Sequence, residues 1–285
     1  TDNLFTLLYL MLLNLFFRKK MVFIFDEYPR PIRGLLKSQL PKWKELAYSL
    51  VLSSFSGYIY MTQELLEYYQ HLRHRPGIVI STITDLSRFK FEASRNEQEN
   101  IWTLTYLGNM ELSKDNVENI ICAFSLLVKK GYDVYLQLFG RPQISDKKKL
   151  DTLIAKLELQ DRISFGAISY EEVPKVLHES SILVSSQPNT KRASGVFPTK
   201  LGEYLMSGRP TLLADVGDIS NLFKHGEHMF FAPAEDPIAY ADQLEYIILH
   251  YDKALDVAQK GKQLIIDKYS HLSAGLKIHN FLTQL

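Results

Sequence analysis

The sequence has a single cysteine, almost no net charge and none of the common nucleotide-binding fingerprints. One thiol, Cys122, excludes an intramolecular disulfide and fits a reducing, cytoplasmic location; within its apolar run we predict a buried core residue. Lysine and arginine total 33 against 32 acids, so no overall field attracts nucleic acid. The absence of GxGxxG and GxxxxGK[ST] argues against nicotinamide dehydrogenases and P-loop hydrolases. The eight histidines lack metal-ligand spacing, so we expect no metal site.

The apolar stretch from Leu4 to Phe17 is too short to span a bilayer. Its positive charge, Arg18-Lys19-Lys20, follows the apolar part, which is the reverse of a signal peptide. We therefore predict a buried helix and no transmembrane segment. Peripheral contact with the inner face of a membrane is the alternative.

Short apolar runs alternate with amphipathic segments along the rest of the chain, which predicts parallel α/β structure. We predict strands at residues 21–25, 57–61, 78–80, 102–107, 134–139, 163–165, 182–185, 211–214 and 229–231. The predicted helices span residues 43–53, 63–71, 116–130, 147–157, 170–179, 198–207, 219–224, 237–251 and 253–269. The polar stretch 84–100 is interpreted as a linker. With 285 residues, two domains are expected, at 1–95 and 96–270, and residues 271–285 form a C-terminal helix able to pack back on the first.

The stretch FPTKLGEYLMSGRPTLLAD, residues 197–215, predicts a helix start followed by a buried strand. Pro198 suits a first helical position, Gly208 ends the helix and Pro210 prevents its continuation. A helix start carries free N–H groups and partial positive charge, so it can hold a phosphate, and Glu203 adds a carboxylate one turn in. The predicted ligand is a diphosphate that also carries sugar hydroxyls.

A second loop follows the first strand of the second domain. Gly108-Asn109-Met110 permits a tight turn, and Lys114 precedes the next predicted helix, where its ammonium can neutralise a diphosphate. A solvated surface lysine is the alternative interpretation.

The segment FPTKLGEYLMSGRPTLLADVGDISNLFKHGE resembles the donor-binding segment of retaining glycosyltransferases of family 4, the group 1 transferases with the GT-B fold. YLGNMELSKDNVENIICAF is similar to that family's strand, loop, lysine and helix, and ISTITDLSRF is similar to the end of its acceptor domain. The resemblance implies an α/β fold of GT-B type, with two Rossmann-like doubly wound domains of which the first is incomplete.

The implied activity is metal-independent transfer of a sugar from a nucleoside diphosphate sugar to an unidentified acceptor, with retention of anomeric configuration. The acceptor class includes glycans, lipids and small molecules, and polysaccharide biosynthesis is the expected setting. By motif position, Glu203 matches the family carboxylate that binds the donor ribose, and Lys114 matches a family cation that binds the diphosphate. These two are the expected catalytic residues. The expected donor-binding residues are Gly108, Asn109, Lys114, Gly195, Val196, Phe197, Pro198, Thr199, Lys200, Leu201 and Glu203. No cofactor beyond the nucleotide sugar, and no nucleic acid partner, is expected.

Three features depart from the family pattern. The family pattern has two acids, the first of which is expected to contact the transferred sugar, and Gly195 occupies the position of that first acid. Asn109 occupies the position of the arginine that usually follows the loop glycine. Roughly half of an acceptor domain is missing, judged against the strand and helix repeats of a doubly wound domain, so we expect an N-terminally truncated chain. These departures keep open a non-catalytic nucleotide-sugar-binding or partner subunit on the same fold. A sugar-nucleotide epimerase or a phosphorylase is a third hypothesis, although no phosphorylase cofactor-lysine signature is found.

Overall fold

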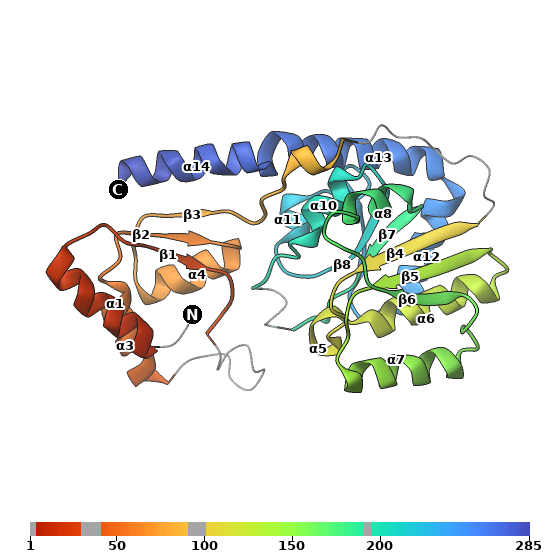
Figure 1. Cartoon of the computed structure of the whole chain (residues 1–285), viewed down its shortest axis with the longest axis horizontal. Helices are drawn as coiled ribbons and strands as arrows, with labels where there is room; N and C mark the ends of the chain where they lie inside the picture. Colours follow the sequence, from red (N-terminus) through yellow and green to blue (C-terminus); the bar gives the residue numbers. More distant parts are fainter. Residues whose placement is uncertain (1–3, 30–40, 91–100, 191–194) are drawn as a thin grey trace. The chain divides into compact units, whose positions relative to one another are not determined.

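The computed structural model describes residues 4–29, 41–90, 101–190 and 195–285, which form two compact units (Figure 1). Unit 1 comprises Thr1–Ile83, Thr190–Phe197 and Leu272–Leu285, and unit 2 comprises Thr84–Asn189 and Pro198–His271. Unit 2 begins at Thr84, whereas the expected second domain begins at residue 96. Residues 190–197, directly before Pro198, belong to unit 1.

Unit 1 is built on a parallel sheet with the strand order β1-β2-β3. The strands are β1 (Val22–Phe25), β2 (Gly57–Tyr60) and β3 (Gly77–Val79), and the helices are α1 (Leu4–Phe17), α3 (Lys42–Leu52), α4 (Gln63–Leu72) and α14 (His271–Gln284). The core between sheet and helices is rich in aromatic residues, with the Phe25 ring stacked on those of Tyr60 and Tyr69. The α14 end of the chain packs on this sheet, because Phe281 contacts Gly57 and Lys277 Nζ donates to Val79 O at 2.9 Å.

Unit 2 contains a larger parallel sheet with the order β6-β5-β4-β7-β8-β9. Its strands are β4 (Trp102–Leu107), β5 (Val134–Phe139), β6 (Ile163–Gly166), β7 (Ile182–Ser185), β8 (Thr211–Asp215) and β9 (Phe230–Pro233). The chain begins in the middle at β4, runs outward to β6, returns to β7 on the other side of β4 and runs outward again. Counted from β4 this is the order 3-2-1-4-5-6 of a doubly wound Rossmann sheet.

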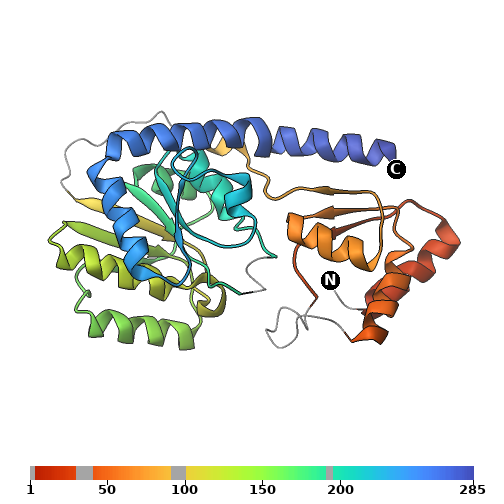
Figure 2. The ribbon, with the colours of Figure 1, turned by 180° about the vertical axis from the view of Figure 1, so that it is seen from behind.

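Helices cover both faces of the unit 2 sheet (Figures 1 and 2). They are α5 (Leu112–Asp115), α6 (Val117–Lys129), α7 (Ile144–Lys156), α8 (Val173–Glu179), α10 (Lys200–Met206), α11 (Ile219–Leu222), α12 (Pro237–Leu249) and α13 (Tyr251–Leu264), with a 3-10 turn at Leu86–Arg88 and a π-helical turn at Ile265–Tyr269. The strands match their predicted ranges closely, because each is a short apolar run covered on both faces.

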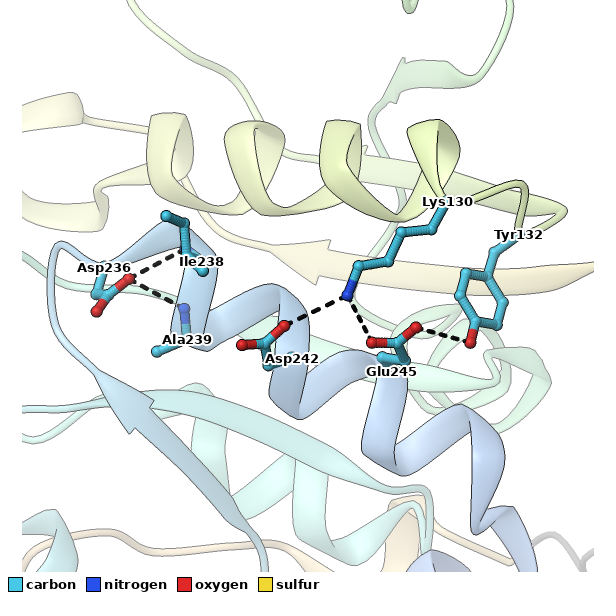
Figure 3. Close-up of polar contacts among 7 residues, drawn as sticks. All are labelled: Lys130, Tyr132, Asp236, Ile238, Ala239, Asp242 and Glu245. Carbon is cyan, nitrogen blue, oxygen red and sulfur yellow. Dashed lines mark hydrogen bonds and ion pairs between the residues drawn. The ribbon is translucent and has the colours of Figure 1, made fainter.

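Polar contacts fix α12 against the neighbouring helix α6 (Figure 3). Lys130 Nζ lies 2.6 Å from Glu245 Oε2 and 3.4 Å from Asp242 Oδ1, and Tyr132 Oη donates to Glu245 Oε1 at 2.9 Å. At the start of α12, the Asp236 carboxylate accepts hydrogen bonds from the N–H groups of Ile238 and Ala239. This is the N-cap that a helix beginning with proline requires for its free N–H groups.

Part of the stretch predicted to be a linker is folded. Thr84 N donates to Tyr269 O at 3.0 Å, and the Asp85 carboxylate caps the 3-10 turn by accepting from Ser87 N at 2.9 Å. Phe89 packs against the cluster that contains Tyr204. The linker prediction is therefore wrong for residues 84–90, and residues 91–100 lie outside the described residues.

Three further predictions need correction. Helix α10 begins at Lys200 rather than Pro198, whose carbonyl accepts from Leu201 N in a preceding turn. Cys122 is half-buried rather than fully buried, and burial raises the pKa of its thiol. Helix α1 buries Leu7 but exposes its opposite face, so it is only partly the buried helix expected. None of the helices within the described ranges is long and apolar enough to cross a bilayer.

Candidate functional site

The candidate site lies at the carboxyl ends of β4 and β7, the adjacent strands from which the chain leaves in opposite directions. In open α/β sheets this switch point is where ligands bind, because the loops on its two sides diverge. Gly108 follows β4 and Ser186 follows β7. Asn119 Nδ2, on α6, donates to Ser186 Oγ at 3.3 Å and ties the two sides together.

Two glycines allow close backbone approach at this edge of the sheet. A Cβ atom at Gly108 would lie 2.4 Å from Tyr106 Oη and 2.7 Å from Lys200 Nζ. At Gly140, which follows β5, φ is +150° and a Cβ atom would lie 1.7 Å from Gly108 O. Glycine at both positions therefore leaves the Lys200 ammonium directly against the turn after β4.

The Lys200 ammonium is buried between Tyr106, Gly108 and Asp115. Its Nζ lies 3.6 Å from Asp115 Oδ1 and 4.2 Å from the centroid of the Tyr106 ring. Within the described part of the chain, this Nζ has no hydrogen-bond partner, and neither has Tyr106 Oη. Burial lowers the pKa of Lys200, and the Asp115 carboxylate opposes that shift. A buried cation whose ion-pair partner lies beyond hydrogen-bond distance is suited to an anionic ligand that supplies a closer acceptor.

Lys114, one of the two expected catalytic residues, lies half-buried in the short helix α5. Its charge also lowers the pKa of Lys200, so the two ammonium groups act on one region. Lys114 forms no ion pair with another described residue, and Asn109 of the same loop is exposed. Lys200 thus lies against Gly108, and Lys114 is close enough for its charge to act on Lys200.

Glu203, the other expected catalytic residue, lies in the first turn of α10 and forms an ion pair with Arg88. The Arg88 guanidinium also stacks on the Tyr170 ring, 3.5 Å from its centroid, and donates to Tyr170 O. Sequence reasoning missed Arg88 because it lies in the stretch interpreted as a linker. Phe89, an apolar residue within that polar stretch, was the signal that the segment packs against the fold.

Of the expected residues, Gly195, Val196 and Phe197 belong to unit 1, whereas the others belong to unit 2. A Cβ atom at Gly195 would lie 2.2 Å from Tyr28 Cε2, and Thr62 Oγ1 donates to Gly195 O at 3.4 Å. An acidic side chain does not fit at position 195 without displacement of Tyr28. Val196 is half-buried and Phe197 is buried. In unit 2, Pro198 and Leu201 are buried and Thr199 is exposed.

Several solved structures share this fold. HepE of Anabaena in complex with UDP has a TM-score of 0.83 at 16% identity, over 99% of this chain and 77% of that chain. HepE in complex with UDP-glucose has a TM-score of 0.79 at the same identity. Sucrose-phosphate synthase of Thermosynechococcus elongatus gives 0.72 at 15% identity, over 92% of this chain and 67% of that one. A glycosyltransferase of Rickettsia africae gives 0.72 at 14% identity, over 98% and 81% respectively.

The fold and the switch-point site define an α/β protein of the GT-B class. Residues 87–264, more than half of the 285-residue chain, match the family described as glycosyl transferases group 1. The chain therefore belongs to the group 1 glycosyltransferases, a family of transferase enzymes. No curated protein matches its sequence.

Proposed function

We propose that this chain transfers a sugar from a nucleoside diphosphate sugar to an acceptor, with retention of anomeric configuration. The observation that carries the proposal is the buried Lys200 ammonium, which has no hydrogen-bond acceptor among the described residues and lies against Gly108 at the switch point. A diphosphate in the turn after β4 supplies the missing acceptor oxygens. The family to which the chain belongs supports the same ligand class.

Lys114 and Lys200 are the proposed diphosphate cations. When the glycosyl bond breaks, negative charge develops on the departing diphosphate, and fixed ammonium groups stabilise that charge most strongly in the transition state. Lys200 thereby compensates for Asn109, which stands where the family pattern has an arginine. With both cations supplied by the protein, we propose a metal-independent reaction that needs no cofactor beyond the donor.

Glu203 is the proposed partner of the donor ribose. A carboxylate offers about four lone-pair sites, so its bond from Arg88 leaves acceptor capacity for ribose hydroxyl groups. Structures of HepE contain UDP and UDP-glucose, which makes uridine the first base to test. Retention, a cytoplasmic location and a role in polysaccharide biosynthesis are further parts of the proposal, and they rest on the resemblance to family 4 and on the single free thiol.

Calorimetric titration with UDP, GDP and ADP tests the assignment. We expect saturable binding of at least one nucleotide, and loss of about 1–3 kcal/mol of binding free energy in Glu203→Gln, the scale of a lost charged hydrogen bond. Lys200→Met should weaken binding of the same nucleotide. Lys175→Met, at an exposed lysine of α8, is the matched control and should bind like the wild type. Absence of saturable binding, or binding unchanged in both site variants, would show that the site is assigned wrongly.

A non-catalytic nucleotide-sugar-binding subunit is the second candidate, favoured by the packing of Gly195 against Tyr28. In this case the acid that the family pattern places on the transferred sugar has no room at position 195. The two candidates agree on nucleotide binding and differ in turnover. Release of sugar from a bound donor would exclude the second candidate.

A further inference from the structure

A tight turn joins α11 to β9 in unit 2, and the residue that closes it is His228. The backbone N–H of Lys224 donates to His228 Nδ1 at 3.1 Å, and the Lys224 carbonyl oxygen accepts from His228 N at 3.0 Å. One residue therefore holds both backbone groups of Lys224. Met229, the next residue, is buried and leads into the edge strand β9, so this turn fixes where the strand begins.

The backbone of the turn lies against α13. A Cβ atom at Gly261 of α13 would lie 2.2 Å from His228 O and 3.1 Å from Leu205 Cδ2. The turn, α13 and α10 thus meet at Gly261, where only a residue without a side chain fits. A shift of the turn at His228 removes packing from α13, which in turn packs against α10, the helix that carries Lys200 and Glu203.

The hydrogen bond from Lys224 N fixes the protonation state of the His228 ring. A backbone N–H group only donates, so Nδ1 must accept and cannot carry a hydrogen. The neutral ring then has its hydrogen on Nε2, which lies 3.5 Å from Glu227 Oε1. A second proton would go to Nδ1. There it would face the donating N–H group of Lys224 and break the hydrogen bond that closes the turn.

The surroundings of the His228 ring also oppose a positive charge. The side chain is only 15% exposed, and burial is the main cause that lowers its pKa from the ordinary value of 6.5. Among the charged groups that act on the ring, the Glu227 carboxylate favours protonation and three ammonium groups oppose it, those of Lys224, Lys260 and Lys268. These lysines come from the turn itself, from α13 and from the π-helical turn that follows α13.

We propose that His228 is an acid-sensitive latch, which holds the turn after α11 closed against α13 while its ring is neutral and releases the turn when the ring is protonated. Since folding lowers the pKa of His228, the unfolded chain takes up this proton at a higher pH than the folded protein. The stability that the latch contributes is therefore complete above pH 6.5 and is lost as pH falls from there through the lower pKa of the folded state. The device concerns the closure of unit 2 and does not depend on which nucleotide binds.

Hydrogen exchange at the Lys224 amide tests the latch in the full chain. The protection factor, which corrects for the intrinsic effect of pH on exchange, should fall roughly threefold to tenfold from about pH 7.5 to about pH 5.5, the net value of one hydrogen bond. The fall should disappear in His228→Asn, because an asparagine Oδ1 atom can replace Nδ1 as the acceptor and does not titrate. In His228→Leu, which has no acceptor, protection should be low at both pH values.

His250→Asn is the matched control. Nδ1 of His250 lies 3.0 Å from Tyr246 O, where it must donate, so protonation leaves that contact intact. This variant should lose Lys224 protection in acid as the wild type does. His225→Asn tests the other histidine of the turn, whose Nδ1 accepts from Phe231 N at 3.0 Å, and it should also keep the wild-type response at Lys224. Circular dichroism confirms that each variant is folded.

The state of the ring gives an independent measurement that requires no variant to fold. Nitrogen–proton correlation NMR of the wild type at neutral pH should show His228 with its hydrogen on Nε2. Three results would overturn the proposal. They are a ring with its hydrogen on Nδ1, Lys224 protection that does not change with pH, and acid sensitivity that persists in His228→Asn.

Discussion

Lys200 and Glu203 bring opposite charges to the start of α10, and each has a different environment. The Lys200 ammonium is buried beside Tyr106 and Asp115, with its pKa lowered by that burial. The Glu203 carboxylate is partly exposed and is oriented by Arg88. A nucleoside diphosphate has complementary parts, with anionic oxygens for the lysine and hydroxyl groups for the carboxylate.

The lowered pKa of Lys200 predicts that nucleotide binding is coupled to proton uptake. A bound diphosphate stabilises the charged ammonium and so raises its pKa, and between the pKa values of the free and bound states each binding event takes up a proton. Affinity for UDP should therefore fall as pH rises from the pKa of the free state to that of the bound state. Calorimetry in buffers of different ionisation enthalpy measures the uptake. It should vanish in Lys200→Met, and uptake that persists in this variant would assign the coupling elsewhere.

Arg88 is predicted to position Glu203 rather than to block it. Its guanidinium is held at once by the Glu203 carboxylate, the Tyr170 ring and the Tyr170 carbonyl oxygen, so it is fixed in place. Arg88→Gln should weaken UDP binding roughly threefold to tenfold, about the net value of one hydrogen bond. Arg88→Lys should be intermediate, because it keeps the charge but not the planar stack. Tighter binding by Arg88→Gln would mean that the arginine competes with the ribose.

At the scale of single residues, the sequence predicted the groups that a local pattern reveals. Gly108, Lys114 and Glu203 lie beside a strand end or a helix start, positions that a local pattern is enough to predict, and their roles in binding stay predictions. The Arg88 contact could not be predicted, because it joins positions 115 residues apart and depends on how a polar segment folds back. The burial of the Lys200 ammonium likewise depends on a distant glycine, Gly108, which leaves room for it.

At the scale of elements, the site depends on how closely the loops after β4 and β5 approach each other. Gly140→Ala should destabilise the protein by roughly 2–5 kcal/mol, because its Cβ atom would overlap Gly108 O and its φ of +150° disfavours a side chain. Gly131→Ala is the control: φ there is +87° but nothing lies within 4 Å of the added atom, so about 1–2 kcal/mol is expected. Urea denaturation compares the two, and equal losses would mean that the close approach is unimportant.

Most elements could be predicted from the sequence, since hydrophobic runs bounded by turn residues mark buried parallel strands. β4, β5 and β7 begin and end at the predicted residues. The wrong predictions lie where tertiary contacts override the local sequence pattern. Residues 84–90 read as polar but fold through contacts to Tyr269 and to the Tyr204 cluster. The apolar α1 reads as buried, but only one of its faces meets the core.

At the scale of the whole molecule, the strand order of unit 2 decides where chemistry can occur. A sheet that starts at its centre and winds in both directions has one switch point, and the Gly108 turn and the start of α10 converge there. The alternation of strands and helices predicted this architecture before any contact was known. The division of the chain between the units was harder to predict, because residues 190–197 and 272–285 join unit 1 from distant parts of the sequence.

The most direct test of the account is the fate of a nucleotide sugar bound at this switch point. Proton NMR of the protein incubated with UDP-glucose follows slow transfer of the sugar to water and identifies the first anomer released. We predict release of UDP together with α-glucose, the retained configuration, and a strongly reduced rate in Lys200→Met, because the charge on the leaving diphosphate is then unsupported. UDP-glucose that binds but is never cleaved, or β-glucose as the first product, would contradict the account.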